Sequence, residues 1–91
     1  MLPQWYVYVL RSLKRDFIYV GSTRDVERRL GEHNRGETQS TKAFLPFEMV
    51  AYIAVQTEKK AVELERYLKT GSGKAVLKKR ILTDEVPVSG T

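Results

Sequence analysis

The chain has 91 residues, of which 42% are hydrophobic and 30% charged, and this composition favours one soluble globular domain spanning residues 1–91 with a modest core. It contains no cysteine, which excludes disulfides, thiolate zinc sites and cysteine nucleophiles. The net charge of +5 and the pI near 9.6 favour a polyanionic partner, and the lack of a signal-peptide pattern or a long apolar run leads us to expect a cytoplasmic protein.

Two short apolar segments near the N-terminus predict a β-hairpin. Residues 5–10 (WYVYVL) and 17–20 (FIYV) are rich in aromatic and β-branched side chains, and the polar stretch between them can turn the chain. Residues 21–23 (GST) are predicted to break the second strand. Asp25 then lies near the start of a helix that we expect to extend to about Asn34.

The second half of the chain predicts a loop, a strand and two helices. Residues 37–46 show no periodicity and are expected to form an exposed loop, whereas residues 47–55 (FEMVAYIAV) predict a third strand. Thr57 can cap a helix that ends near Lys69, and residues 71–73 (GSG) are predicted to stop it. A short helix at about 74–82 and a frayed tail at 83–91 complete the chain.

The element order ββαβαα predicts an α/β (α+β) fold in which a small three-stranded, mainly antiparallel sheet is flanked by helices, with its core at about residues 5–82. The excess positive charge lies at the C-terminal end, where residues 66–83 hold six basic residues and no acidic one. This stretch either binds a polyanion or forms a solvated helix face. The basic residues are Arg66, Lys69, Lys74, Lys78, Lys79 and Arg80.

The first predicted helix places Arg29 and His33 on the same face as Val26 and Leu30, because residues three and four apart are neighbours on a helix. A histidine on an apolar face is more often structural than a ligand. An arginine directed toward the sheet needs an anionic or carbonyl partner, and a phosphate is one candidate with matching geometry.

Glu65 lies inside the apolar stripe of the second predicted helix, whereas Glu63 should face outward. A carboxylate in that position requires compensation. It either pairs with a buried cation such as Arg29 or binds a hard metal ion such as magnesium through oxygen, and the pattern alone does not decide between the two.

Strand alternation puts Tyr6 and Tyr8 on one face of the first strand and Phe17 and Tyr19 on one face of the second. Stacked tyrosines at such positions usually belong to the core, with their hydroxyl groups at its rim. The tyrosines alone therefore do not identify a catalytic site.

Together these residues form a recognisable pattern: Tyr6-Val7-Tyr8, then Tyr19-Val20-Gly21, then Arg29, His33-Asn34 and Glu65. The pattern resembles the GIY-YIG nuclease family, most of all its small stand-alone bacterial members, and covers about residues 5–82. The first triplet departs from the family name, because Tyr6 replaces glycine and Val7 replaces isoleucine.

The resemblance implies a metal-dependent endonuclease that hydrolyses phosphodiester bonds of DNA, single-stranded or branched DNA included, with a preference for strand structure rather than sequence. Tyr19 corresponds to the proposed general base and Tyr8 to its neighbour that positions water and phosphate. Arg29 would bind the scissile phosphate, and His33 would relay a proton or orient a tyrosine. Glu65 would be the sole protein ligand of one Mg²⁺ or Mn²⁺ ion.

The resemblance also implies that the nucleic-acid backbone contacts six basic side chains, and that the last helix does not read bases. The six are Arg29, Lys69, Lys74, Lys78, Lys79 and Arg80. Some family members also use a late asparagine, which this chain lacks after Asn34, and Ser72 is a candidate replacement. Two other interpretations stay open: a non-catalytic nucleic-acid-binding module, and an adapter in a DNA-repair complex.

Overall fold

A computed structural model describes residues 2–82, and the predicted frayed tail at 83–91 lies outside them. Within this range no helix has the length and apolar character needed to cross a membrane. The predicted order of strands and helices is confirmed, with a short 3₁₀ turn added in the loop before the third strand. The elements are β1 Trp5–Ser12, β2 Ile18–Thr23, α1 Val26–Asn34, η1 Lys42–Phe44, β3 Phe47–Val55, α2 Glu58–Leu68, α3 Gly71–Val76 and the π-helical turn η2 Leu77–Ile81.

The sheet is antiparallel, in the order β2-β1-β3, so the first strand of the chain is its centre. Tyr8 pairs with Gly21 of β2 on one side and with Tyr52 of β3 on the other. This arrangement confirms the predicted α+β fold with a three-stranded antiparallel sheet. It also leaves β2 at an edge of the sheet, where side chains from the two faces of the sheet can come together.

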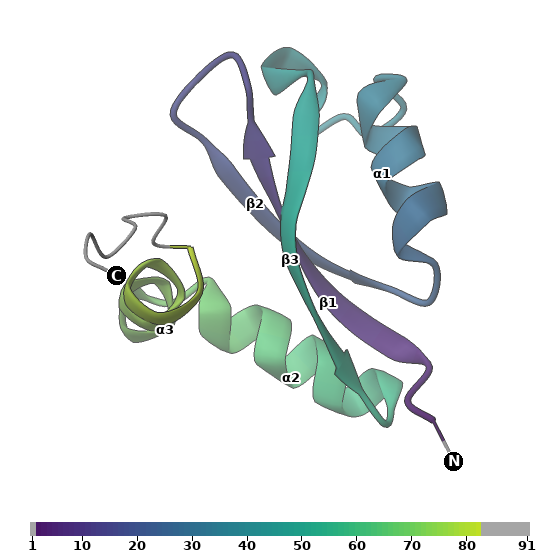
Figure 1. Cartoon of the computed structure of the whole chain (residues 1–91), viewed down its shortest axis with the longest axis vertical. Helices are drawn as coiled ribbons and strands as arrows, with labels where there is room; N and C mark the ends of the chain where they lie inside the picture. The colour runs from purple at the N-terminus through teal and green to yellow at the C-terminus, as the bar shows by residue number, and fades with distance from the viewer. Residues whose placement is uncertain (1, 83–91) are drawn as a thin grey trace, which may run out of the picture.

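Helices cover both faces of the sheet, with α1 on one face and α2 and α3 on the other (Figure 1). Consecutive residues of β1 are therefore buried instead of alternating: Val7 and Val9 pack toward α2, and Tyr8 and Leu10 pack toward α1. Each such apolar side chain contributes about 1.5–3 kcal/mol when it is fully buried. The central strand is thus the most firmly held element, and it carries Tyr8.

The predicted end of β2 before Gly21 is wrong, because the strand continues to Thr23. Gly21 lies opposite Tyr8, and a Cβ atom at Gly21 would come 2.5 Å from the Tyr8 hydroxyl oxygen. Glycine is tolerated here because it allows the tyrosine ring to lie across the neighbouring strand. A residue that looked like a strand breaker therefore makes room for a site residue.

The second helix ends at Leu68, as predicted, but the next helix begins at Gly71 and not at about residue 74, so the predicted start of the last helix is wrong. The Thr70 hydroxyl caps this helix by accepting a hydrogen bond from the Gly73 amide at 3.1 Å. Gly73 packs so closely on the Tyr67 carbonyl that a Cβ atom would overlap it. This contact lets the chain turn sharply after α2, and the turn brings the basic segment back beside β2.

Candidate functional site

Three buried side chains form a hydrogen-bonded chain between β1, α1 and the loop that follows α1. The Tyr8 hydroxyl lies 2.9 Å from Nε2 of His33, and Nδ1 of His33 lies 2.8 Å from the Thr41 hydroxyl. His33 and Thr41 are fully buried, and Tyr8 is 1% exposed. The predicted apolar-face histidine is therefore satisfied on both ring nitrogens, and it is connected directly to one of the predicted tyrosines.

Tyr19 completes an aromatic group with Tyr8 and His33. Its ring centroid lies 5.0 Å from that of His33 and 6.2 Å from that of Tyr8. Tyr19 is half-buried, so part of its side chain remains open to solvent, unlike Tyr8. The structure thus brings together two predicted tyrosines from different strands and a histidine from α1.

Arg29 lies one helical turn before His33 on α1. It works to lower the pKa of Tyr8. Its guanidinium makes a 2.8 Å ion pair with Glu32, three residues later on the same helix. Glu32 is the main cause of the raised pKa of Arg29, and Arg29 is the main cause of the lowered pKa of Glu32. The anionic partner that Arg29 was expected to need is thus supplied by its own helix.

Burial sets the protonation of Tyr8 and His33. Burial first, and then the nearby Tyr19, raise the pKa of Tyr8 to about 12, although Arg29 partly opposes them. Burial first, and then Arg29, lower the pKa of His33. At neutral pH the phenol therefore keeps its proton and the imidazole is uncharged.

Glu65 lies on α2, on the other side of the sheet from α1, and its carboxylate has two partners. One oxygen accepts a 2.8 Å hydrogen bond from the Ser22 hydroxyl on β2, and the other pairs with the Lys69 ammonium at 2.9 Å. The alternative that Glu65 pairs with Arg29 is wrong. The cation that compensates Glu65 is Lys69, four residues later on the same helix.

Lys69 connects the two parts of the site across the edge strand. Its ammonium nitrogen lies 5.5 Å from the centroid of the Tyr19 ring while it holds Glu65. The hydrogen bond from Ser22 also places the Glu65 carboxylate beside β2, the strand that carries Tyr19. The five predicted site residues therefore surround one stretch of β2. They are Tyr8, Tyr19, Arg29, His33 and Glu65.

The donor set near Glu65 fits a divalent ion that needs few protein ligands. Among residues 2–82 no three His, Cys, Asp or Glu side chains come together as a metal-binding cluster. Mg²⁺ is often held by one or two carboxylates, with water and substrate phosphate completing its octahedron. Glu65 is 23% exposed in its side chain and can supply one such carboxylate once Lys69 moves from its oxygen.

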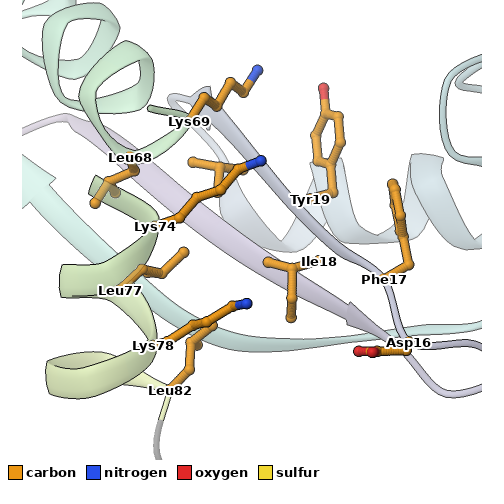
Figure 2. Close-up of a pocket in the computed structure, with 11 residues that line it drawn as sticks. Asp16, Phe17, Ile18, Tyr19, Leu68, Lys69, Lys74, Leu77, Lys78 and Leu82 are labelled. Carbon is orange, nitrogen blue, oxygen red and sulfur yellow. The ribbon is translucent and has the colours of Figure 1, made fainter. Parts of the chain in front are cut away.

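A groove beside Tyr19 runs between β2 and the segment from the end of α2 to Leu82, with a cavity volume of about 540 Å³ (Figure 2). Lys69, Lys74 and Lys78 extend along one wall, and the β2 side of the groove ends at Asp16. In the part of the chain that the structure describes, neither Lys74 nor Lys78 is held in an ion pair. Lys79 and Arg80, predicted to act with them, do not line this groove.

Sequence reasoning missed four partners that hold the site residues in place. Glu32 and the Lys69 partner of Glu65 follow helical spacings of three and four residues, so their pairing could have been read from the sequence. Ser22 lies in residues first assigned to a strand end, and Thr41 lies in a loop without periodicity. For Thr41 the sequence offers no signal, because only the path of the loop brings it to His33.

Comparisons with known proteins agree with this arrangement. Residues 4–80 match the family model described as the GIY-YIG catalytic domain. A UPF0213 protein of Natronomonas pharaonis is 35% identical over 86 residues, which cover 93% of this chain and 98% of the relative. A UPF0213 protein of Haloquadratum walsbyi is 35% identical over 66 residues, covering 71% and 73% of the two chains. No solved structure matches.

Proposed function

Because the chain belongs to the GIY-YIG family, we propose that it is a cytoplasmic endonuclease that hydrolyses phosphodiester bonds of DNA with the help of one divalent ion, Mg²⁺ or Mn²⁺. The observation that carries the proposal is the convergence of four polar site residues and Glu65 around strand β2, beside a lysine-lined groove. No base-reading element is needed for this activity, so strand structure rather than sequence selects the substrate.

Arg29 binds the scissile phosphate and stabilises charge in the transition state. A guanidinium has five N–H donors in a fixed plane, so its pairing with Glu32 through one nitrogen leaves donors for a phosphate. Glu32 also fixes the orientation of the side chain before substrate arrives. Arg29 is 30% exposed, which leaves it within reach of a phosphate.

The two tyrosines differ in their exposure to solvent, and we assign them different catalytic roles for that reason. Tyr8 is buried and keeps its proton, so it is a hydrogen-bonding group that positions the attacking water beside the phosphate. Tyr19 is partly open to solvent, to which it can lose its own proton, and its phenolate oxygen then accepts a proton from the attacking water as the general base. His33 holds Tyr8 through its Nε2 atom.

Glu65 would hold the divalent ion, and the ion when bound would supply positive charge at the reacting phosphate. Ser22 fixes one carboxylate oxygen by its hydrogen bond, so the direction of the other oxygen is also set. Lys69 leaves Glu65 at that stage, and its ammonium is then available to a neighbouring phosphate in the groove.

The test is a cleavage assay on labelled single-stranded, duplex and branched DNA, with RNA alongside, in magnesium, manganese or a chelator. We expect cleavage with either metal ion and none with the chelator. Binding without cleavage under every metal condition would indicate the non-catalytic module instead. Cleavage that appears only with a co-purifying nuclease would indicate the adapter.

The groove predicts which cations bind the nucleic-acid backbone. In the variant with Lys74→Gln and Lys78→Gln, the slope of log affinity against log salt should fall by about 0.7–0.9 for each phosphate that the protein no longer neutralises. The matched control, Lys79→Gln with Arg80→Gln, removes the same charge outside the groove and should keep most of the slope. Equal slopes for the two variants would contradict a backbone path through the groove; fluorescence anisotropy over a salt series measures both.

A further inference from the structure

Thr41 is held in a fixed position against the imidazole of His33. Its side chain is fully buried, with its hydroxyl oxygen 2.8 Å from Nδ1 of His33. Its backbone is tied at both groups, since its amide donates to the Thr38 carbonyl and its own carbonyl accepts from the Phe44 amide. The hydroxyl therefore stays at the ring nitrogen that faces away from Tyr8.

Counting protons limits the hydrogen-bonded chain to two arrangements. An uncharged imidazole has one N–H donor and one acceptor nitrogen, and each hydroxyl has one proton. In the first arrangement Tyr8 donates to Nε2 of His33, Nδ1–H donates to Thr41, and Thr41 donates to the Thr38 carbonyl, 3.4 Å away. In the second arrangement, the Thr41 hydroxyl donates to Nδ1 of His33, and Nε2–H of His33 donates to the Tyr8 oxygen.

The partner of the Thr41 hydroxyl distinguishes the two arrangements. This hydroxyl donates its single proton to the Thr38 carbonyl at 3.4 Å, so at Nδ1 of His33 it can only accept. Among the described residues, Nε2 of His33 is the acceptor that the structure places at the buried Tyr8 hydroxyl. Tyr8 therefore donates to Nε2, which leaves the imidazole proton on Nδ1 and requires Thr41 to accept it.

We propose that Thr41 is a positioning residue that fixes His33 as the Nδ1–H tautomer, so that Nε2 accepts the hydroxyl proton of Tyr8 and sets the direction of the Tyr8 oxygen lone pairs. The inference rests on the proposed function for its catalytic consequence. With the phenol proton directed into the protein, the Tyr8 oxygen is left as an acceptor for a hydrogen bond from the attacking water, while Arg29 contacts the phosphate. Thr41 itself touches neither the substrate nor the metal ion.

The tautomer can be observed without any activity measurement. The chain has a single histidine, so the two imidazole nitrogens of His33 give unambiguous signals in a long-range ¹H–¹⁵N correlation spectrum. At about pH 8, where the imidazole is uncharged, we expect Nδ1 at the shift of a protonated nitrogen and Nε2 at that of an unprotonated one. An Nε2–H tautomer in the wild-type protein overturns the proposal, whether or not the protein cleaves DNA.

Two variants separate the hydroxyl from the shape of the side chain. Thr41→Val keeps the volume but removes the acceptor for Nδ1–H, so we expect a mixture of tautomers and a loss of about tenfold in turnover. Thr41→Ser keeps the acceptor and should restore both the wild-type tautomer and most of the turnover. An unchanged tautomer in Thr41→Val, or equal losses of turnover in both variants, contradicts the positioning role.

Failure of the proposed function gives a different result. If the wild-type protein has the Nδ1–H tautomer and Thr41→Val loses it, but no substrate is cleaved with any metal ion, the role of Thr41 stands and the nuclease assignment falls. If cleavage depends on metal ion while the tautomer is Nε2–H, the nuclease assignment stands and the role of Thr41 falls.

Discussion

Replacing Glu65 with glutamine is expected to lower cleavage by roughly a thousandfold, which corresponds to about 4 kcal/mol of lost transition-state stabilisation. Glutamine has the shape of glutamate and can still accept the Ser22 hydrogen bond. It lacks the negative charge that the divalent ion requires. The fold should be preserved, because the Lys69 pair that the substitution removes lies on the surface of α2 and contributes at most about 1 kcal/mol.

The matched control is Glu63→Gln on the same helix. Glu63 is exposed, faces away from the site, and only approaches Lys60 at 3.7 Å. The Glu63→Gln variant should cleave DNA at the wild-type rate. Circular dichroism and thermal unfolding of both variants test whether the fold is intact. Wild-type activity in Glu65→Gln, or an equal loss in Glu63→Gln, removes Glu65 from the site.

Replacing Arg29 with alanine should lower turnover by about 100- to 1000-fold, the cost of losing a principal group that stabilises charge on the reacting phosphate. Arg29→Lys keeps a positive charge but loses the planar fork, so it should recover only a minor part of the rate. The change should fall on kcat more than on KM, because the charge on the phosphate oxygens is greatest in the transition state.

Arg28 provides the control for Arg29 because it is the adjacent arginine and also pairs with Glu32, at 3.6 Å. Its side chain is 68% exposed and lies off the face of α1 that carries His33. Arg28→Ala removes the same charge from the same helix and should keep wild-type turnover. Similar losses in both variants would mean that the helix contributes only general electrostatic attraction.

The helices and β3 could be predicted well because local signals determine them. Asp25 and Thr57 cap α1 and α2 through hydrogen bonds to the Arg28 and Lys60 amides, as their sequence positions indicated. The errors fell at Gly21 and at residues 71–73. Glycine in a sequence suggests a break, but here its lack of a side chain permits close packing with Tyr8 and with α2, which only the tertiary structure reveals.

For the candidate site, the sequence pattern could identify the residues but not most of their partners. The pattern located Tyr8, Tyr19, Arg29, His33 and Glu65, which the structure brings around one strand. Their partners were predictable only within one helix, because the sheet register and the loop path decide the others. The pairing of Ser22 with Glu65 and that of Thr41 with His33 therefore needed coordinates.

The central place of β1 has a consequence for the synthesis of the protein. β1 leaves the ribosome well before β3, yet Trp5 pairs with Val55, so the sheet cannot close until β3 has been translated. Glu65 and the groove lysines are made later still. A nascent chain thus holds Tyr8, Tyr19, Arg29 and His33 without a metal ligand or a groove, and the proposed nuclease cannot act until α2 and α3 have also been translated.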